Sequence, residues 1–255
     1  MSVWKTPPMR LDRYCSMIGI GSRSDVATWC KTGSITVDNQ IIKYPDMKTP
    51  RWSVISITTP YWWIIAFECK QAVTVLLHKP TWYVCSNLDE GGHMSYSNLL
   101  KNCPYRKSLQ VAGRLDQDTT WLVICTNDGD LNHRIISPKH KLPKTYIVTC
   151  LHPLTDDMKD KLIWWVELDD GYQTLPAKID TIPDEWLVST PWSEEELSRM
   201  FALTIIEGKY HQVKRMLQAV GNQVIALHRW SVWPWSVSWL GLGEWRYIDE
   251  ADSLF

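Results

Sequence analysis

Short β-rich runs and short helical runs are intermixed along this chain without a regular alternation. SLQVAG, WLVICT, KTYIVTC, FALTII and NQVIALHRW have strand character and follow one another between residues 108 and 230. Parallel strands have to be joined by crossover connections, usually helices, and a regular strand–helix repeat of that kind is absent. The sequence therefore predicts an α+β protein with a mixed, largely antiparallel sheet and flanking helices.

The clearest helical pattern is KYHQVKRMLQAVG, residues 209–221. Its apolar residues recur at the i, i+3, i+4, i+7 spacing of one helix face: Val213, Met216, Leu217 and Val220. Gly221 supplies a stop at the C-terminal end. DDMKDKLIW predicts a surface helix behind Thr155, and the NDGD turn predicts a short helix with Asp130 as its cap.

Residues 9–58 have the pattern of a compact unit of their own. Ser22 is a typical N-cap and Gly33 a typical C-terminal stop, so SRSDVATWCKTG predicts a helix. SITVDNQIIKY then predicts two short strands about an Asp-Asn turn. We therefore expect a small α/β domain over residues 1–60 and a larger domain over residues 61–255.

The composition excludes several classes of protein. Hydrophobic residues make up 45% and charged residues 22% of the 255 residues, which is typical of a folded chain rather than a disordered one. No run approaches the roughly 18 apolar residues of a membrane helix, and the N-terminus lacks the apolar segment of a signal peptide. The seven cysteines form no CxxC pair, so we expect no disulfide framework, no zinc site and a cytoplasmic location.

The charges are segregated although the net charge is only −1. Residues 1–60 contain eight lysines and arginines against four aspartates, and residues 131–150 contain four basic residues and no acidic one. Residues 156–196 contain twelve acidic residues against three lysines. Basic surfaces suit a polyanion such as RNA, but solvated protein faces give the same pattern, so the charges alone leave both interpretations open.

GRLDQDTTW, residues 113–121, is a candidate for chemistry. Asp116 and Asp118 point to the same side of an extended chain. Paired carboxylates occur in acid–base hydrolysis and at metal sites, but they also cap turns, and no second acidic cluster has a matching spacing. By itself the motif allows an aspartate-dependent hydrolase, a metal site or a structural turn.

A longer compound pattern contains this motif. GRLDQDTTWLVICTNDGDLNHRIISPKHKLPKTY is preceded by HKPTWYVCS and followed by IIEGKYHQVKRMLQAVGN, while MRLDRYCS and GSRSDVATWCKTGSITVDN lie near the N-terminus. In this order the segments resemble the RsuA family of pseudouridine synthases over residues 9–250. These enzymes detach a specific uracil of ribosomal RNA, turn it and rejoin it through carbon. The resemblance implies an RNA-binding domain of the ribosomal-protein-like type at residues 1–60 and a catalytic domain at residues 61–255.

The resemblance also implies roles for individual residues. The catalytic aspartate falls on Asp116, which acts on the ribose as a nucleophile or stabilises positive charge that develops there. The basic residue that keeps it ionised falls on Lys214, with Arg215 as the alternative. The active-site tyrosine falls on Tyr146, whose ring can stack on the displaced base and whose hydroxyl can relay a proton. Asp118 is interpreted as a structural residue that bonds the amides of the turn.

Further basic residues are candidates for RNA contacts. Arg114 is expected to contact the RNA backbone or to fill the space left by a flipped base, and Arg215 is a further candidate. Residues near Tyr146 are expected to contact phosphates: Arg134, Lys139 and Lys144. Residues of the N-terminal unit are expected to dock RNA: Arg10, Arg13, Arg23 and Lys31. The family requires neither a metal nor a cofactor, so neither is expected.

The expected partner is small-subunit ribosomal RNA or a pre-ribosomal particle, since KTY, HQVKRM and SPKHK are most similar to family members acting there. We expect a monomer without membrane association. A second hypothesis is a non-catalytic RNA-binding or ribosome-assembly protein with the same fold. It is motivated by Trp82 and Trp121, which stand where the family usually has glycine, a residue that tolerates positive φ. Trp121 follows the catalytic loop, where it is expected to crowd the site or lower stability.

Overall fold

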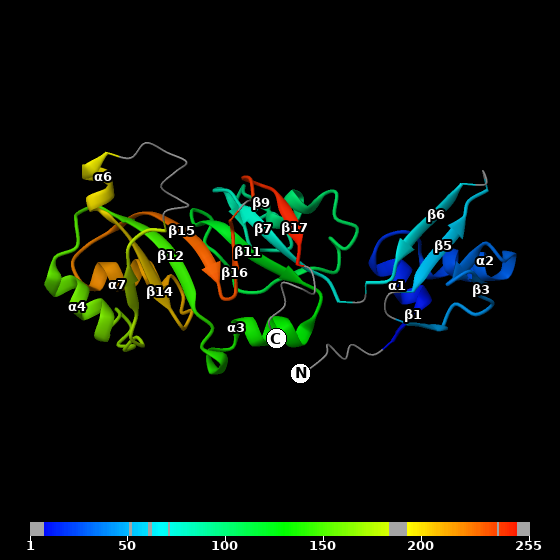
Figure 1. Ribbon diagram of the computed structural model, residues 1–255, viewed down its shortest axis with the longest axis horizontal. Helices are drawn as coiled ribbons and strands as arrows, with labels where there is room; N and C mark the ends of the chain where they lie inside the picture. The colour runs from blue at the N-terminus through cyan, green and yellow to red at the C-terminus, as the bar shows by residue number, and fades with distance from the viewer. Residues whose placement is uncertain are drawn as a thin grey trace.

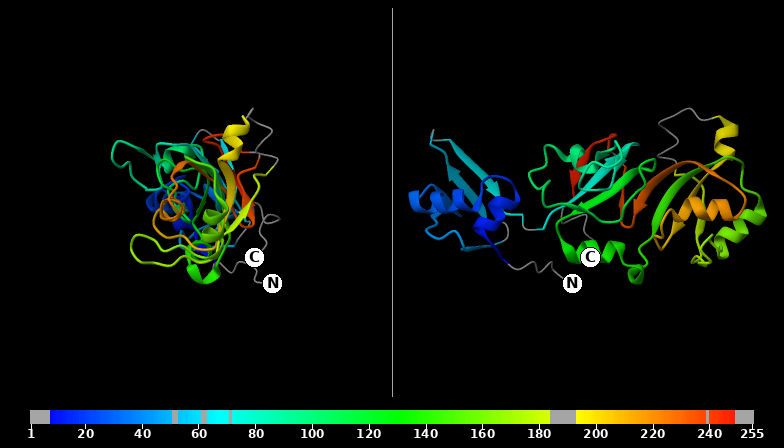
Figure 2. Two further views of the ribbon diagram at one scale, coloured as in Figure 1. Left: turned by 90° about the vertical axis from the view of Figure 1, so that its left-hand side faces the viewer. Right: turned by 180° about the vertical axis from the view of Figure 1, so that it is seen from behind.

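The computed structural model describes residues 8–50, 53–60, 63–70, 72–183, 193–238 and 240–248. A small N-terminal unit and a larger unit lie at opposite ends of an elongated molecule (Figure 1). The view from behind in Figure 2 shows the same separation, with the blue and cyan elements at one end. Residues 184–192, which belong to the acidic segment, lie outside the described residues.

Two helices and a four-stranded sheet form the N-terminal unit. The strand order is β3-β2-β5-β6, all neighbours are antiparallel, and α1 packs against α2. The elements are β1 (Met9–Arg10), α1 (Leu11–Met17), α2 (Arg23–Thr32), β2 (Ile35–Val37), β3 (Gln40–Ile41), β4 (Lys48–Thr49), β5 (Val54–Thr58) and β6 (Ile64–Glu68). The short strands β1 and β4 pair with each other.

The ends of α2 and the turn after it follow from the local sequence. The Ser22 hydroxyl accepts a hydrogen bond from the Asp25 amide, and the Asp25 carboxylate accepts one from the Ser22 amide, which completes a capping box. Gly33 ends the helix in the left-handed region, at φ 69°. Asp38 and Asn39 both have positive φ in the turn between β2 and β3, as the Asp-Asn turn predicts.

The N-terminal sheet extends further along the chain than the sequence indicates. β6 pairs with β5 along its whole length, from Glu68 opposite Val54 to Ile64 opposite Thr58. The boundary expected at residue 60 therefore falls inside a hairpin, and the second sheet begins with β7 at Thr74. Pro60 favours a linker and a turn between strands alike, and only the long-range pairing distinguishes the two.

The larger unit is built on a nine-stranded sheet. Its main order is β13-β14-β12-β15-β11-β7-β17, with β10 paired to β11 and β16 paired to β15. Within this sheet the described strand pairs are antiparallel apart from β11 with β15, which confirms the predicted α+β fold with a mixed, largely antiparallel sheet. The strands are β7 (Thr74–Lys79), β10 (Gln110–Val111), β11 (Thr120–Thr126), β12 (Lys144–Cys150), β13 (Lys178–Asp180), β14 (Met200–Ile205), β15 (Val224–Val232), β16 (Trp235–Ser236) and β17 (Trp245–Tyr247).

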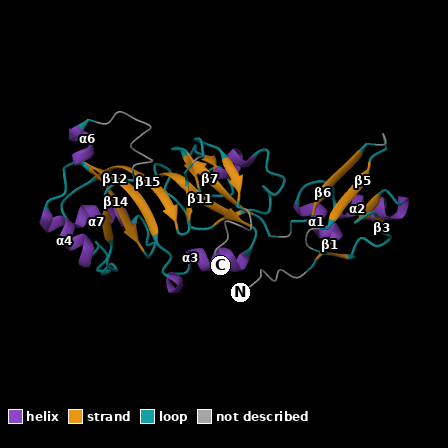
Figure 3. Ribbon diagram, in the orientation of Figure 1, coloured by secondary structure: helices purple, strands orange, loops and turns teal. Residues whose placement is uncertain are grey.

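Helices flank this sheet, as the purple ribbons of Figure 3 show. They are η1 (Tyr96–Leu100), α3 (Gly129–Ile136), η2 (Pro138–His140), α4 (Asp156–Trp164), α6 (Glu194–Ser198) and α7 (Gln212–Ala219). A small parallel pair, β8 (Tyr83–Val84) with β9 (Met94–Ser95), lies in the connection between β7 and η1. None of the helices in the described ranges is long and apolar enough to cross a membrane.

The helix termini test the local predictions directly. The apolar face predicted for residues 209–221 is buried at Val213, Met216 and Leu217, although α7 begins only at Gln212. Thr155 caps α4 as expected. The cap of α3 is Asp128 and not Asp130, because the Asp128 carboxylate accepts hydrogen bonds from the amides of Asp130 and Leu131.

A buried tyrosine pair joins the two units. The Tyr14 hydroxyl on α1 lies 2.9 Å from the Tyr105 hydroxyl in the larger unit. It also accepts a hydrogen bond from the Lys70 amide at 2.9 Å, in the segment that links the two sheets. Both tyrosine side chains are buried, so this contact forms part of the core rather than a surface association.

Candidate active site

The loop between β10 and β11 carries Asp116, and a buried arginine fixes its first half. Arg229 on β15 is almost completely buried, and its Nε donates a hydrogen bond of 2.9 Å to the Leu122 carbonyl. Its Nη2 donates one of 2.9 Å to the carbonyl of Gly113, whose φ is 87°. The arginine therefore connects the start of the loop to the strand that follows it.

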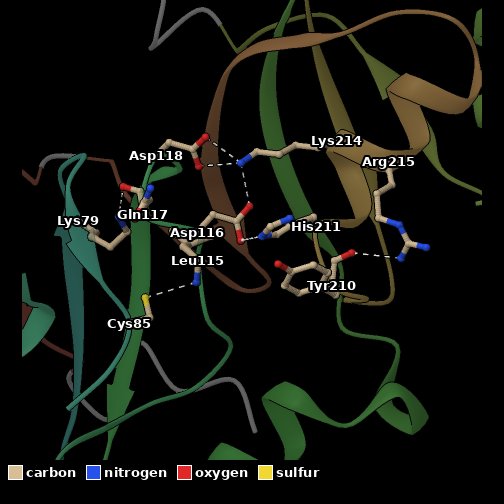
Figure 4. A network of polar contacts seen from close by, with 10 residues as sticks. All are labelled: Lys79, Cys85, Leu115, Asp116, Gln117, Asp118, Tyr210, His211, Lys214 and Arg215. Atoms are coloured by element: carbon tan, nitrogen blue, oxygen red, sulfur yellow. Dashed lines mark hydrogen bonds and ion pairs between the residues drawn. The ribbon is translucent and has the colours of Figure 1, made fainter. Parts of the chain in front are cut away.

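A buried lysine fixes the second half of the loop. Lys79, the last residue of β7, is completely buried, and its ammonium donates to three carbonyls, those of Pro80, Tyr83 and Gln117. Burial lowers the pKa of Lys79 to about 8. The HKP segment thus holds Gln117, the residue directly after Asp116, from below the loop (Figure 4).

Asp116 lies between two cationic or proton-donating side chains. Nζ of Lys214 is 3.0 Å from Oδ2 of Asp116, and Nε2 of His211 is 3.2 Å from its Oδ1. The three side chains are between about a quarter and a third exposed, at 26%, 27% and 36%. Each carboxylate oxygen therefore has its own partner, and both partners come from the start of α7 (Figure 4).

Lys214 also contacts Asp118, for which the sequence predicts only bonds to the turn amides. The Asp118 carboxylate does bond its own backbone amide, and the contact with Lys214 is additional. The ammonium donates hydrogen bonds of 2.7 and 2.9 Å to the two oxygens of the Asp118 carboxylate. Burial lowers the pKa of Lys214, but hydrogen bonds to Asp118 and Asp116 outweigh it and raise the pKa above its ordinary value. One ammonium therefore balances two carboxylates at the mouth of the site.

A polar network fixes the segment that precedes α7. The buried Glu207 accepts hydrogen bonds from the Gln212 side chain at 2.5 Å and from the Tyr172 hydroxyl at 2.8 Å. The Gln212 side-chain oxygen accepts from the Lys209 amide, which closes the turn. His211 adopts positive φ at the N-cap position, and this conformation directs its ring toward Asp116.

These residues line one pocket. It encloses about 400 Å³ including its open mouth, and Asp116, Lys214, His211 and Tyr146 all contribute to its wall. Tyr146 on β12 is only 8% exposed. The remaining lining residues are Arg114, Leu115, Thr119, Ile205, Gly208, Lys209, Gln212, Val213 and Leu227. The three residues expected to form the catalytic centre thus converge in one cleft that also contains apolar walls.

The structure distinguishes between Lys214 and Arg215, the two candidates for the basic partner of Asp116. Arg215 forms ion pairs with Asp169 and Asp170, the latter at 2.8 Å, and its side chain points in a different direction from Lys214 in Figure 4. Successive residues of a helix are rotated by about 100°, so only one of the two can face the loop. Among the described contacts Arg215 therefore does not reach Asp116.

The basic residues predicted to contact RNA in the larger unit differ in exposure, and one of them is buried. Arg114 is exposed at the pocket, Lys139 is exposed on η2 and Arg134 is half-buried on α3. Lys144 is buried, and its ammonium donates to the Leu142 carbonyl at 3.1 Å. Burial, followed by the charge of Arg229, lowers the pKa of Lys144 to about 8. The expectation of a phosphate contact from Lys144 is therefore wrong.

The basic residues predicted in the N-terminal unit are all exposed: Arg10, Arg13, Arg23 and Lys31. Arg10 is partly neutralised, because its guanidinium forms an ion pair of 2.7 Å with the buried carboxylate of Asp12. The other three project from α1 and α2. Their exposure is compatible with RNA docking, which stays a prediction.

Two tryptophans occupy backbone conformations that favour glycine. Trp82 has φ 68° and Trp121 has φ 81°. The Trp121 ring stacks on His228 at 4.6 Å between centroids and contacts Trp230 edge-on. Trp121 is not among the residues that line the pocket. The expectation that it crowds the site is therefore wrong, and the alternative, a cost in stability, stays a prediction.

Sequence reasoning missed three residues of this site: His211, Lys79 and Arg229. His211 lies outside the helical stripe, and its position three residues before Lys214, about one helical turn, is the available signal. Lys79 and Arg229 resemble surface charges in the sequence, and only the buried carbonyls around them reveal their positions. Among the described residues, no group of three or more metal-binding side chains is found.

Comparison with known proteins identifies the family. The model for RNA pseudouridylate synthase matches residues 73–219, which include all the pocket residues except Leu227. The chain belongs to this family. The most similar curated relatives include the ribosomal small subunit pseudouridine synthase A of Vibrio parahaemolyticus, 36% identical over 97% of this chain and 100% of the relative. The proteins of the same name from Yersinia pestis and Escherichia coli are 38% and 37% identical, each over 87% of this chain and over 86% and 87% of the relative.

A solved structure supports the same assignment. A crystal structure of a pseudouridylate synthase superposes with a TM-score of 0.61 and 30% sequence identity. The match covers 96% of this chain and 97% of the other. The similarity therefore includes the N-terminal unit as well as the sheet that carries the pocket.

Proposed function

We propose that this protein converts a specific uridine of small-subunit ribosomal RNA into pseudouridine, with Asp116 as its essential carboxylate and without a cofactor. The relatives named for the small subunit support the choice of RNA. The observation that carries the proposal is the position of Asp116, paired with Lys214 at 3.0 Å in a pocket that also contains Tyr146. The N-terminal unit would dock the RNA or pre-ribosomal particle through its exposed basic residues.

The reaction is balanced without an external reagent. The bond from N1 of uracil to C1′ of the ribose breaks, and a bond from C5 to C1′ forms. C5 loses a proton and N1 gains one, so the product is an isomer of the substrate. No electron donor or acceptor is consumed, and the protein has to supply only charge stabilisation, orientation and proton transfer.

Asp116 would act at the ribose. Cleavage of the glycosidic bond develops positive charge at C1′, and a carboxylate can stabilise it electrostatically or attack the carbon. Both routes need the carboxylate to be held in one orientation, and Lys214 and His211 each bind one of its oxygens. Neither route assigns a proton to Asp116 in the bond-breaking step.

Tyr146 would hold the detached base. Its ring forms part of the pocket wall, and a flipped uracil could stack on it while it turns. The Tyr146 side chain is largely buried, so little water reaches its ring. Its hydroxyl would accept or return the C5 proton. Arg114 would contact the RNA backbone beside the flipped nucleotide, and its exposed position in the pocket lining supports this role.

Release of tritium tests the function. The substrate is small-subunit ribosomal RNA labelled at C5 of uracil, offered both free and in an immature ribosomal particle, with large-subunit RNA as the control. We expect release from small-subunit RNA, and none from it after Asp116→Asn. Equal RNA binding by both proteins without any release would instead support the non-catalytic RNA-binding protein, which the glycine-like conformations of Trp82 and Trp121 motivate.

A further inference from the structure

Trp82 presents an exposed indole on a turn that is hydrogen-bonded to the loop carrying Asp116. The side chain is 66% exposed although it is among the most hydrophobic in the chain. Its indole stacks on the imidazole of His93 with centroids 5.4 Å apart and an angle of 26° between the rings. The imidazole covers one face of the indole, so the exposed area belongs mainly to the other face and to the ring edge.

This aromatic pair is connected to the catalytic loop. The Trp82 amide donates a hydrogen bond of 2.9 Å to the carbonyl of Gln117, which directly follows Asp116. The ammonium of Lys79 donates to the same carbonyl at 3.2 Å. The turn that carries Trp82 and the loop that carries Asp116 therefore share one hydrogen-bonded framework, so the indole has a fixed position relative to the carboxylate.

The second ring of the pair is also held in place. His93 and Glu90 exchange backbone hydrogen bonds of 2.9 and 3.1 Å in a tight turn. Gly91 and Gly92 form this turn, and both have positive φ. His93 is thereby fixed beneath the indole, and the stacked rings form a preorganised surface.

The backbone of Trp82 argues against a role in folding. Its φ of 68° lies in the left-handed region, which is unfavourable for a residue with a Cβ atom. A side chain that is two-thirds exposed recovers little of this cost through burial. Unfavourable backbone conformations of this kind concentrate at functional sites, where the position of the side chain is used.

The charges around the pair favour a base over a phosphate group. The Asp89 carboxylate accepts hydrogen bonds from the Ser95 amide and the Asn98 side chain, and the Glu90 carboxylate accepts one from the Ser86 hydroxyl. These two carboxylates place negative charge in the loop between Trp82 and His93. Phosphate binding there would be unfavourable, whereas stacking on an uncharged base is not opposed in this way.

We infer that Trp82, supported by His93, is a stacking platform for an unpaired base that neighbours the target uridine in the same RNA strand. The inference rests on the proposed function, because it assumes that the target nucleotide leaves its stack to enter the pocket. Its departure exposes the face of the adjacent base, and an aromatic ring beside the pocket can cover that face. Stacking of this kind tolerates any base, so Trp82 contributes affinity rather than sequence recognition.

Three variants test the platform. Trp82→Gly removes the ring and suits the positive φ, so it should fold with an unchanged or higher melting temperature. We expect its Kd for substrate RNA to rise at least about 5-fold, the lower limit for loss of one base–aromatic stack. Trp82→Tyr should restore most of the affinity. Trp164→Ala is the matched control, since Trp164 is 71% exposed on α4 at the far end of the larger unit, and its Kd should not change.

A fluorescent base gives a direct readout of stacking. An RNA oligonucleotide with 2-aminopurine beside the target uridine should lose fluorescence on binding the wild-type protein or Trp82→Tyr, and much less on binding Trp82→Gly. Equal affinity and equal quenching for wild type and Trp82→Gly would overturn the platform. Both measurements are made in the Asp116→Asn background, so they judge the platform independently of tritium release, which judges the proposed function.

Discussion

Nζ of Lys214 lies 3.0 Å from Oδ2 of Asp116, although the two residues come from a helix and a loop that are far apart in the sequence. The same ammonium lies 2.7 Å from the Asp118 carboxylate, so Lys214 forms ion pairs with two carboxylates. Removal of the cation would leave two negative groups close together in a partly buried cleft. The expected consequences of this arrangement, and of the network around it, can be measured one residue at a time.

Substitution of Lys214 should impair the chemical step. Lys214→Met removes the cation that orients Asp116, and we expect kcat to fall by about 100-fold or more, as for loss of one preorganised donor in an active site. Lys214→Arg retains the charge and should stay within about 10-fold of wild type. Single-turnover tritium release measures both. Arg215→Met is the neighbouring control, and a loss equal to that of Lys214→Met would contradict the assigned pairing.

His211 should act as a positioning residue for Asp116. His211→Ala removes the hydrogen bond to Oδ1, and we expect kcat to fall by about 10-fold while KM for RNA changes little. His211→Gln offers an N–H donor of similar reach and should recover part of the loss. An equal fall for both variants, or a change confined to KM, would show that the ring acts on RNA binding instead.

Trp121 should cost stability through its backbone. Its φ of 81° is unfavourable for any residue with a Cβ atom, while its ring gains contacts with His228 and Trp230. Comparison of Trp121→Gly with Trp121→Ala removes the ring in both cases and isolates the backbone. We expect the glycine variant to be more stable by about 1 kcal/mol in urea unfolding. Greater stability of the alanine variant would show that the backbone relaxes out of the left-handed region.

His228 should make folding sensitive to acid. Burial, followed by the charge of His78, lowers the pKa of His228 to about 4, against an ordinary value of 6.5. Between pH 6.5 and 4 the unfolded chain therefore binds a proton that the folded chain does not. The stability contribution is fully present above pH 6.5 and is lost as the pH falls toward 4, by about 1–3 kcal/mol.

Urea unfolding at pH 7 and pH 4.5 measures this loss. His228→Phe retains a ring that can stack on Trp121 but cannot titrate, and it should lose less stability between the two pH values than the wild type. His140→Phe, at an exposed position on η2, should behave like the wild type. If His228→Phe loses as much stability as the wild type, another group is responsible for the acid sensitivity.

Local patterns in the sequence predicted much of the fold. The N-cap at Ser22, the glycine stop at Gly33 and the apolar face of α7 are short-range features, and the structure contains all three. The domain boundary was misplaced because the pairing of β6 with β5 is set by the whole sheet and not by the residues around Pro60. Local residue types specify a turn but not which sheet its flanking strands join.

The sequence predicts some residues of the site and not others, because local patterns do not show which side chains the fold buries or turns toward Asp116. The convergence of Asp116, Tyr146 and Lys214 in one pocket agrees with the expectation from the resemblance. Lys144 lies two residues before Tyr146, a spacing that puts both side chains on one face of a regular strand. The register of β12 shifts between Thr145 and Tyr146, and the Lys144 ammonium is buried against the Leu142 carbonyl while Tyr146 lines the pocket. His211 was missed because its left-handed conformation, rather than a helical spacing, directs it to Asp116.

In the proposed reaction Asp116 acts on the ribose, while Asp118 only shares the cation of Lys214 with it. The most direct test is single-turnover tritium release from C5-labelled small-subunit RNA by Asp116→Asn and Asp118→Asn, with RNA binding measured for each. We expect Asp116→Asn to bind RNA and release no label, and Asp118→Asn to retain release within about 10-fold of wild type. Release by Asp116→Asn at a rate near that of the wild type would contradict the account.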